Sequence, residues 1–65
     1  MSSDTPQRLA TMANQIARNL ARDDDPVAAT AAHISSFWTP AMIAMLQGAD
    51  GVALDPLARE ALGRV

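Results

Sequence analysis

The stretch His33-Ile34-Ser35-Ser36-Phe37-Trp38-Thr39-Pro40-Ala41-Met42 contains the only histidine, the only phenylalanine and the only tryptophan of the chain. It also predicts a helix boundary, because proline disfavours helix in the residue before it and has no N–H to donate. Phe37 and Trp38 are neighbours, so on a helix they point about 100° apart and cannot fill the same seam. We expect one of them to serve the chain's own core and the other to meet a second surface, which in so short a chain can belong to another protein.

The combination of a capping residue and a proline occurs four times along the chain. The four pairs are Thr5-Pro6, Asp25-Pro26, Thr39-Pro40 and Asp55-Pro56. A hydroxyl or carboxylate at the N-cap accepts a hydrogen bond from a free N–H of the first turn. Proline is tolerated at the first helical position, because the N–H that it lacks would have no hydrogen-bond partner within the helix. The pattern predicts four helix starts.

Apolar spacing predicts how these helices run and pack. The first helix has a stripe with helical spacing, made of Leu9, Met12, Ala13, Ile16, Ala17 and Leu20. In the second helix the inward stripe is Val27, Ala31, Ile34 and Trp38, which favours Trp38 as the internal anchor. His33 and Phe37 then lie four residues apart on a neighbouring face.

We therefore expect helices over residues 6–21, 26–38, 40–47 and 56–62, with a loop over residues 49–54. No stretch alternates with a period of two, so no sheet is expected. The predicted fold class is all-α: one small helical domain over residues 1–65, with two longer antiparallel helices followed by two short helices.

The chain is short for a stable core. Hydrophobic residues make up 49% of its 65 residues, but alanine is the commonest of them and each alanine buries little area. Domains of this size are usually supported by disulfides, a metal or association. Because the chain has no cysteine, disulfides and thiolate metal sites are excluded. Association with another chain is the expected support.

Charge and hydropathy exclude two kinds of partner. The net charge is −2 and the sequence pI is about 4.9, whereas a nucleic-acid-binding domain usually has a basic face and a high pI. No apolar run approaches the ~20 residues that span a bilayer. Met1-Ser2-Ser3-Asp4 has neither the basic nor the apolar region of a signal peptide. We expect a cytoplasmic protein that binds neither nucleic acid nor membrane.

Catalytic residues are not expected in this chain. His33 is the one candidate for acid–base chemistry near neutral pH, and the chain has no cysteine or lysine nucleophile. Ser35 and Ser36 do not share its helix face. There is no glycine-rich phosphate loop and no metal-ligand spacing, and Asp23-Asp24-Asp25 is typical of a solvated turn with a cap. The chain is therefore not expected to be an enzyme by itself.

Four short motifs are specific when taken together. They are Met12-Ala13-Asn14-Gln15-Ile16-Ala17, His33-Ile34 with Phe37-Trp38, Pro40-Ala41-Met42, and Leu54-Asp55-Pro56-Leu57. Their order and spacing, from about Leu9 to Leu62, resemble the delta subunit of NAD-dependent, molybdenum-containing formate dehydrogenase. Thr39 and Ala41 stand where members of that family often have an acidic residue and an arginine. Thr39 can still cap a helix, but a salt bridge from an arginine at position 41 is lost.

The resemblance implies a small, cofactor-free accessory subunit of a soluble cytoplasmic complex that oxidises formate to carbon dioxide. In that family the alpha subunit carries bis-molybdopterin guanine dinucleotide and iron–sulfur clusters. The beta and gamma subunits carry FMN and further clusters and pass electrons to NAD. The delta subunit is implied to stabilise or assemble the alpha subunit.

We expect the contacts with the alpha subunit to come from seven residues. They are Asn14, Gln15, His33, Phe37, Trp38, Pro40 and Met42. Trp38 can instead pack in the chain's own core. For Phe37 and Met42 we favour a contact with the partner. Two other functions stay open: a transient chaperone for molybdenum cofactor insertion, and a free-standing homodimeric helical adaptor that associates through the apolar stripe of the first helix.

Overall fold

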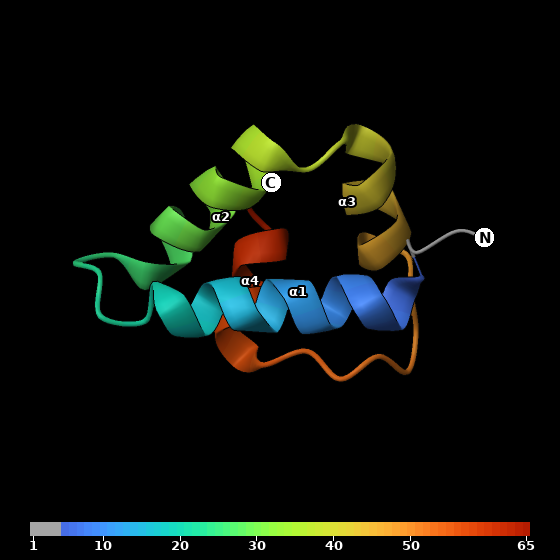
Figure 1. The fold of residues 1–65 in the computed structure, drawn as a ribbon, viewed down its shortest axis with the longest axis horizontal. Helices are drawn as coiled ribbons and strands as arrows, with labels where there is room; N and C mark the ends of the chain where they lie inside the picture. The colour runs from blue at the N-terminus through green and yellow to red at the C-terminus, as the bar shows by residue number, and fades with distance from the viewer. Residues whose placement is uncertain (1–4) are drawn as a thin grey trace.

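Four helices make up the computed structural model, which describes residues 5–65. α1 spans Pro6–Asn19, α2 spans Pro26–Phe37, α3 spans Pro40–Gln47 and α4 spans Pro56–Leu62 (Figure 1). No strand occurs in the described part of the chain, so the all-α prediction is confirmed. The argument from Met1-Ser2-Ser3-Asp4 about a signal peptide lies outside the described residues.

All four helices begin at the prolines, and three of them have the expected side-chain cap. The side-chain oxygens of Thr5, Asp25 and Thr39 each lie 3.2 Å from the backbone nitrogen three residues later, which donates to them. Asp55 makes no such bond at the start of α4. Its carboxylate oxygen Oδ2 lies 3.6 Å from Nε of Arg18 instead. The cap prediction is wrong for Asp55, because an ion pair with another helix draws its carboxylate away.

The two longer helices end earlier than the sequence suggests. α1 ends at Asn19 rather than at residue 21, because Leu20 leaves helical geometry at φ −105° and ψ 7°. α2 ends at Phe37 rather than at residue 38. Trp38 is extended, at φ −92° and ψ 149°, because it leads into the extended Thr39 that caps α3. Apolar spacing therefore predicted the course of the two helices but placed their C-terminal ends one or two residues too late.

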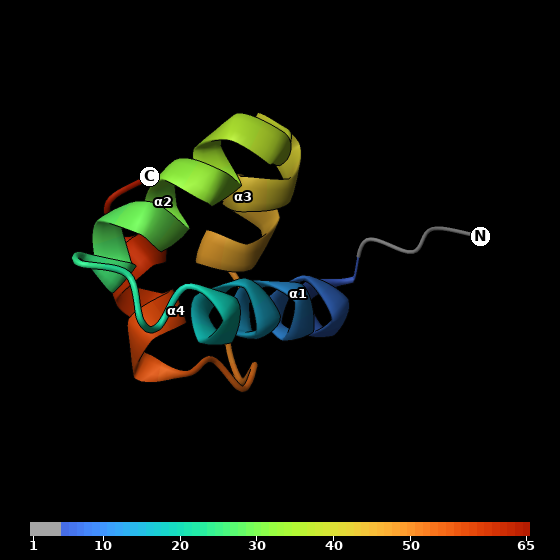
Figure 2. The same ribbon diagram turned by 60° about the vertical axis from the view of Figure 1, so that its left-hand side comes forward.

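The elements lie on two sides of α1. In Figures 1 and 2, α2 and α3 lie on one side of α1, while the loop between α3 and α4 passes along the other. α4 packs against both α1 and α2. α2 rises obliquely from the turn that follows α1, so the views do not show the expected antiparallel pair packed along its length.

The core combines small residues of α1 with larger residues from the other helices. Its buried members are Leu9, Ala10, Ala13, Ala17, Ile34, Trp38, Leu46, Ala58 and Leu62. As expected, one of the two neighbouring aromatic residues is buried and the other is exposed: Trp38 is 7% exposed and Phe37 is 74% exposed. Trp38 as the internal anchor is therefore confirmed.

One buried polar side chain in α2 was not foreseen. Thr30 is 0% exposed, and its Oγ1 has no hydrogen-bond partner among the described residues. The expected inward stripe of α2 did not include this position. A buried hydroxyl without a partner is costly. The packing of α2 is therefore less than optimal at this point.

Candidate partner interface

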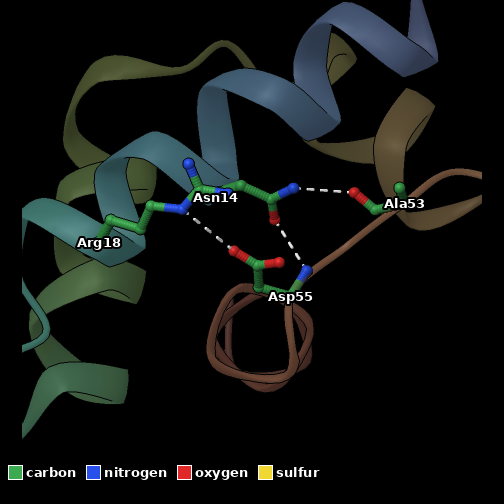
Figure 3. Close-up of polar contacts among 4 residues, drawn as sticks. All are labelled: Asn14, Arg18, Ala53 and Asp55. Atoms are coloured by element: carbon green, nitrogen blue, oxygen red, sulfur yellow. Dashed lines mark hydrogen bonds and ion pairs between the residues drawn. The ribbon is translucent and has the colours of Figure 1, made fainter.

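A side-chain amide on α1 ties the loop before α4 to α1 (Figure 3). Asn14 Nδ2 donates to the carbonyl oxygen of Ala53 over 2.8 Å, and Asn14 Oδ1 accepts from the backbone N–H of Asp55, also over 2.8 Å. The two ends of one planar amide thus satisfy two backbone groups that lie 39 and 41 positions away in sequence. Asn14 thereby fixes where α4 begins relative to α1.

An ion pair lies beside this amide. Arg18, one helical turn after Asn14, has its Nε 3.6 Å from Oδ2 of Asp55 (Figure 3). The two side chains are 73% and 43% exposed, so water screens the pair and it contributes less than about 1 kcal/mol. We call Asn14, Arg18, Ala53 and Asp55 the α1–loop clamp. The amide is its main part and the ion pair supplements it.

An aromatic pair lies on the surface of α2. The rings of His33 and Phe37 have centroids 4.6 Å apart and are tilted by 37°. Both residues are exposed, and apart from its contact with His33 the side chain of Phe37 is largely open to solvent. Residues four apart on a helix are neighbours, which brings the two rings together on the surface of α2.

The structure places the expected contact residues in different surroundings. His33 and Phe37 form the surface pair, and Pro40 is exposed at the start of α3. Met42 is half-buried against the core. Trp38 is buried, with 7% of its surface exposed.

The two expected contact residues on α1 lie on the other side of the molecule. Asn14 already uses both ends of its amide within the α1–loop clamp, a role that the sequence analysis missed. Gln15 is exposed and lines a shallow hollow beside Ala53. The loop that contains Ala53 lies across α1 from α2 and α3 (Figures 1 and 2). The seven residues therefore do not form one continuous surface.

A further exposed apolar residue lies on α3. Met45 is 41% exposed, and the sequence analysis did not select it. Ala41 and Ala44 on the same helix are also exposed. The signal was present in the sequence, because α3 is apolar on more than one side and a short helix can bury only one of them.

An open hollow lies where the end of α3, the following loop and α4 meet. Its volume is about 390 Å³, and Leu46, Val52, Leu54 and Leu62 supply its apolar lining. Asp50 and Arg59 also line it. Gln47 Nε2 donates to the carbonyl oxygen of Leu62 over 2.8 Å, which ties the ends of α3 and α4 together. The hollow thus has charged groups in its wall, unlike the surface of α2.

The described residues do not suit a metal or redox centre. Within residues 5–65, no three His, Cys, Asp or Glu side chains are grouped so that they could hold a metal ion. The chain has no cysteine to ligate an iron–sulfur cluster. In the same part of the chain, no helix is both long and apolar enough to cross a bilayer.

These features define a small all-α protein that presents an exposed aromatic pair on one helix and holds its closing loop by a polar clamp. The chain matches the family described as NADH-dependent formate dehydrogenase delta subunit FdsD over residues 8–62. It belongs to this family, as the motifs in its sequence indicated. No curated protein and no solved structure matches the chain.

Proposed function

We propose that the chain is a non-catalytic subunit of a cytoplasmic, NAD-dependent formate dehydrogenase and that it stabilises or assembles the alpha subunit. The observation that carries the proposal is the family match over residues 8–62. In the proposed complex the alpha subunit holds bis-molybdopterin guanine dinucleotide and iron–sulfur clusters. The beta and gamma subunits hold FMN and further clusters and reduce NAD with the electrons from formate.

Two properties of the chain support a role in association. Its core relies on alanine at four of the nine buried positions of the central cluster, so the fold gains much from additional packing. Phe37 is 74% exposed, and covering such a ring stabilises a complex by about 1.5–3 kcal/mol. A partner surface over α2 would provide what the isolated chain lacks.

The test is a pull-down of the tagged 65-residue chain after co-expression with the alpha, beta and gamma subunits. We expect stoichiometric recovery of a complex that reduces NAD with formate, and a lower molybdenum content of the alpha subunit when the 65-residue chain is left out. Recovery with cofactor-free alpha subunit alone would instead identify a transient chaperone. Recovery of no other subunit would contradict the proposal and favour the homodimeric adaptor.

A further inference from the structure

The hollow between the end of α3, the following loop and α4 has an apolar floor. Leu46 and Leu62 are 1% and 4% exposed, so only a small part of each leucine faces the hollow. Val52 and Leu54 are half-buried and line it as well. Its volume of about 390 Å³ lies near the lower end of the ~300–1,000 Å³ range of clefts that hold small ligands. One large apolar side chain of another molecule, with its neighbours at the rim, is of the size that fills it.

Two opposite charges lie in the wall of the same hollow. Asp50 belongs to the loop and Arg59 to α4, and both residues are exposed. Neither side chain takes part in an ion pair or a side-chain hydrogen bond within residues 5–65. Both charges are therefore available to an incoming molecule.

The walls of the hollow are held in place by contacts within the chain. Gln47 Nε2 donates to the carbonyl oxygen of Leu62 over 2.8 Å, which fixes the end of α3 relative to the end of α4. The amide of Asn14 holds Ala53, which lies between two lining residues of the loop. Gly51 has a φ of 75°, a conformation that favours glycine, so the loop can turn sharply at the rim. A hollow with fixed walls loses little conformational freedom when it binds a partner.

We propose that this hollow docks a segment of another subunit of the formate dehydrogenase complex in which a large apolar side chain lies between an acidic and a basic residue. This inference rests on the proposed function, which supplies the complex. The apolar side chain packs on the leucine floor, the acidic residue meets the guanidinium of Arg59, and the basic residue meets the carboxylate of Asp50. Interfaces commonly gain most of their affinity from one such anchor in a pocket and their specificity from the charges around it.

The two charges in the wall decide the chemistry of the occupant. A purely apolar segment would remove water from Asp50 and Arg59 without replacing it, which is unfavourable. A purely acidic segment would attract Arg59 but repel Asp50, and a purely basic segment would do the reverse. A nucleic-acid backbone is uniformly negative and is disfavoured for the same reason. Only an occupant with both signs of charge satisfies both wall residues.

A second copy of the chain is a poorer occupant. The large apolar side chains that are exposed among residues 5–65 are Phe37, Met45 and Val65. Phe37 and Met45 lie within residues 26–49, which contain no arginine, lysine, aspartate or glutamate. They therefore bring no counter-charge to the hollow, and Val65 has only a basic neighbour, Arg64. No exposed apolar side chain of this chain lies between opposite charges.

The experiment measures the affinity of the full 65-residue chain for the complex of alpha, beta and gamma subunits. Asp50→Arg and Arg59→Glu reverse the two wall charges at exposed positions, so the core stays intact. We expect each variant to bind at least about tenfold more weakly, with unchanged helix content by circular dichroism. Val52→Trp places an indole ring in the hollow and should weaken binding at least as much, because the ring competes with the incoming side chain.

Matched controls separate charge in the hollow from charge in general. Asp24→Arg and Arg22→Glu make the same two reversals at exposed positions in the turn between α1 and α2. They change the net charge of the chain by the same amounts and should bind within about twofold of the unchanged chain. Equal weakening by the controls and the wall variants would overturn the proposal, since charge would then act without regard to the hollow.

A crosslink identifies the occupant directly. Val52→benzoylphenylalanine places a photoreactive group at the hollow of the otherwise unchanged chain. We expect it to crosslink to a segment of another subunit in which a large apolar residue lies between an acidic and a basic one, as sequenced by mass spectrometry. A crosslink to a segment without these charges, or only to a second copy of this chain, would overturn the proposal.

Two further results would also overturn the proposal, and they bear differently on the proposed function. If the unchanged chain binds the complex and Asp50→Arg, Arg59→Glu and Val52→Trp bind equally well, docking uses another surface while the subunit role stands. If the unchanged chain does not bind the complex, the proposed function falls together with the inference.

Discussion

The two sides of α1 are held by different chemistry. On one side, the α1–loop clamp fixes the loop with two hydrogen bonds of 2.8 Å and an ion pair. On the other side, α2 and α3 lie without a single arginine, lysine, aspartate or glutamate. Directional polar contacts appear where the loop closes on α1, whereas the two helices on the other side carry no fixed charge.

This difference has a physical reason. Hydrogen bonds set the position of a loop because they tolerate little change in distance and angle. Apolar contact is non-directional and depends on the area removed from water, so it suits a surface that is completed only by another molecule. The polar contacts of this chain therefore set the position of its closing loop, while α2 and α3 pack on α1 largely through apolar side chains.

The largest expected effect separates the two neighbouring aromatic residues. Trp38→Ala removes a core side chain and should lower the free energy of unfolding by about 3–5 kcal/mol, which is enough to unfold so small a chain. Phe37→Ala should keep the helix content and weaken the complex instead. Circular dichroism with thermal melting, together with pull-down of the complex, measures both. A Phe37→Ala chain that loses helix content more than partner binding would contradict this division of roles.

The α1–loop clamp gives the next largest effect. Asn14→Ala leaves the carbonyl of Ala53 and the N–H of Asp55 without their partner and should lower the free energy of unfolding by about 1–2 kcal/mol. The gain in helix propensity from alanine offsets a part of this loss. Urea denaturation measures the change, and faster exchange of the Asp55 amide proton localises it. Gln15→Ala, at the next and exposed position, is the control and should stay within about 0.5 kcal/mol.

The buried hydroxyl of α2 predicts a gain in stability. Thr30→Val replaces an unpartnered hydroxyl by a methyl group of similar size and should raise the free energy of unfolding by about 1 kcal/mol. Thermal melting measures the rise. Thr11→Val is the matched control, because Thr11 is exposed and donates to the carbonyl of Gln7. A decrease in stability for Thr30→Val would show that this hydroxyl has a partner after all.

The smallest effect compares two helix starts. Thr39→Ala removes a side-chain cap and should cost about 1 kcal/mol. Asp55→Ala removes only an exposed ion pair with Arg18 and should cost less than about 1 kcal/mol, decreasing as salt is added. Denaturation at low and high salt distinguishes the two. Equal, salt-independent losses would mean that Asp55 caps α4 like the other three N-cap residues.

The local features of this protein follow from its sequence. The four prolines mark the four helix starts, and side-chain caps support three of them, because both the cap and the fixed φ of proline act within one turn. The spacing of Val27, Ala31, Ile34 and Trp38 correctly indicated which aromatic residue turns inward. The motifs around His33 and Asp55 also sufficed to indicate the family that the match over residues 8–62 confirmed.

Local sequence patterns did not predict the contacts between distant parts of the chain. The sequence did not indicate that Asn14 holds a loop about 40 positions away, and it predicted Asp55 as a side-chain cap, whereas its carboxylate faces Arg18. Thr30 is fully buried, although the expected inward stripe of α2 did not include it. One-dimensional spacing defines the faces of a helix, but which element covers each face depends on how all four helices pack together. That packing decides which polar groups, such as the amide of Asn14, meet a partner and which, such as the hydroxyl of Thr30, do not.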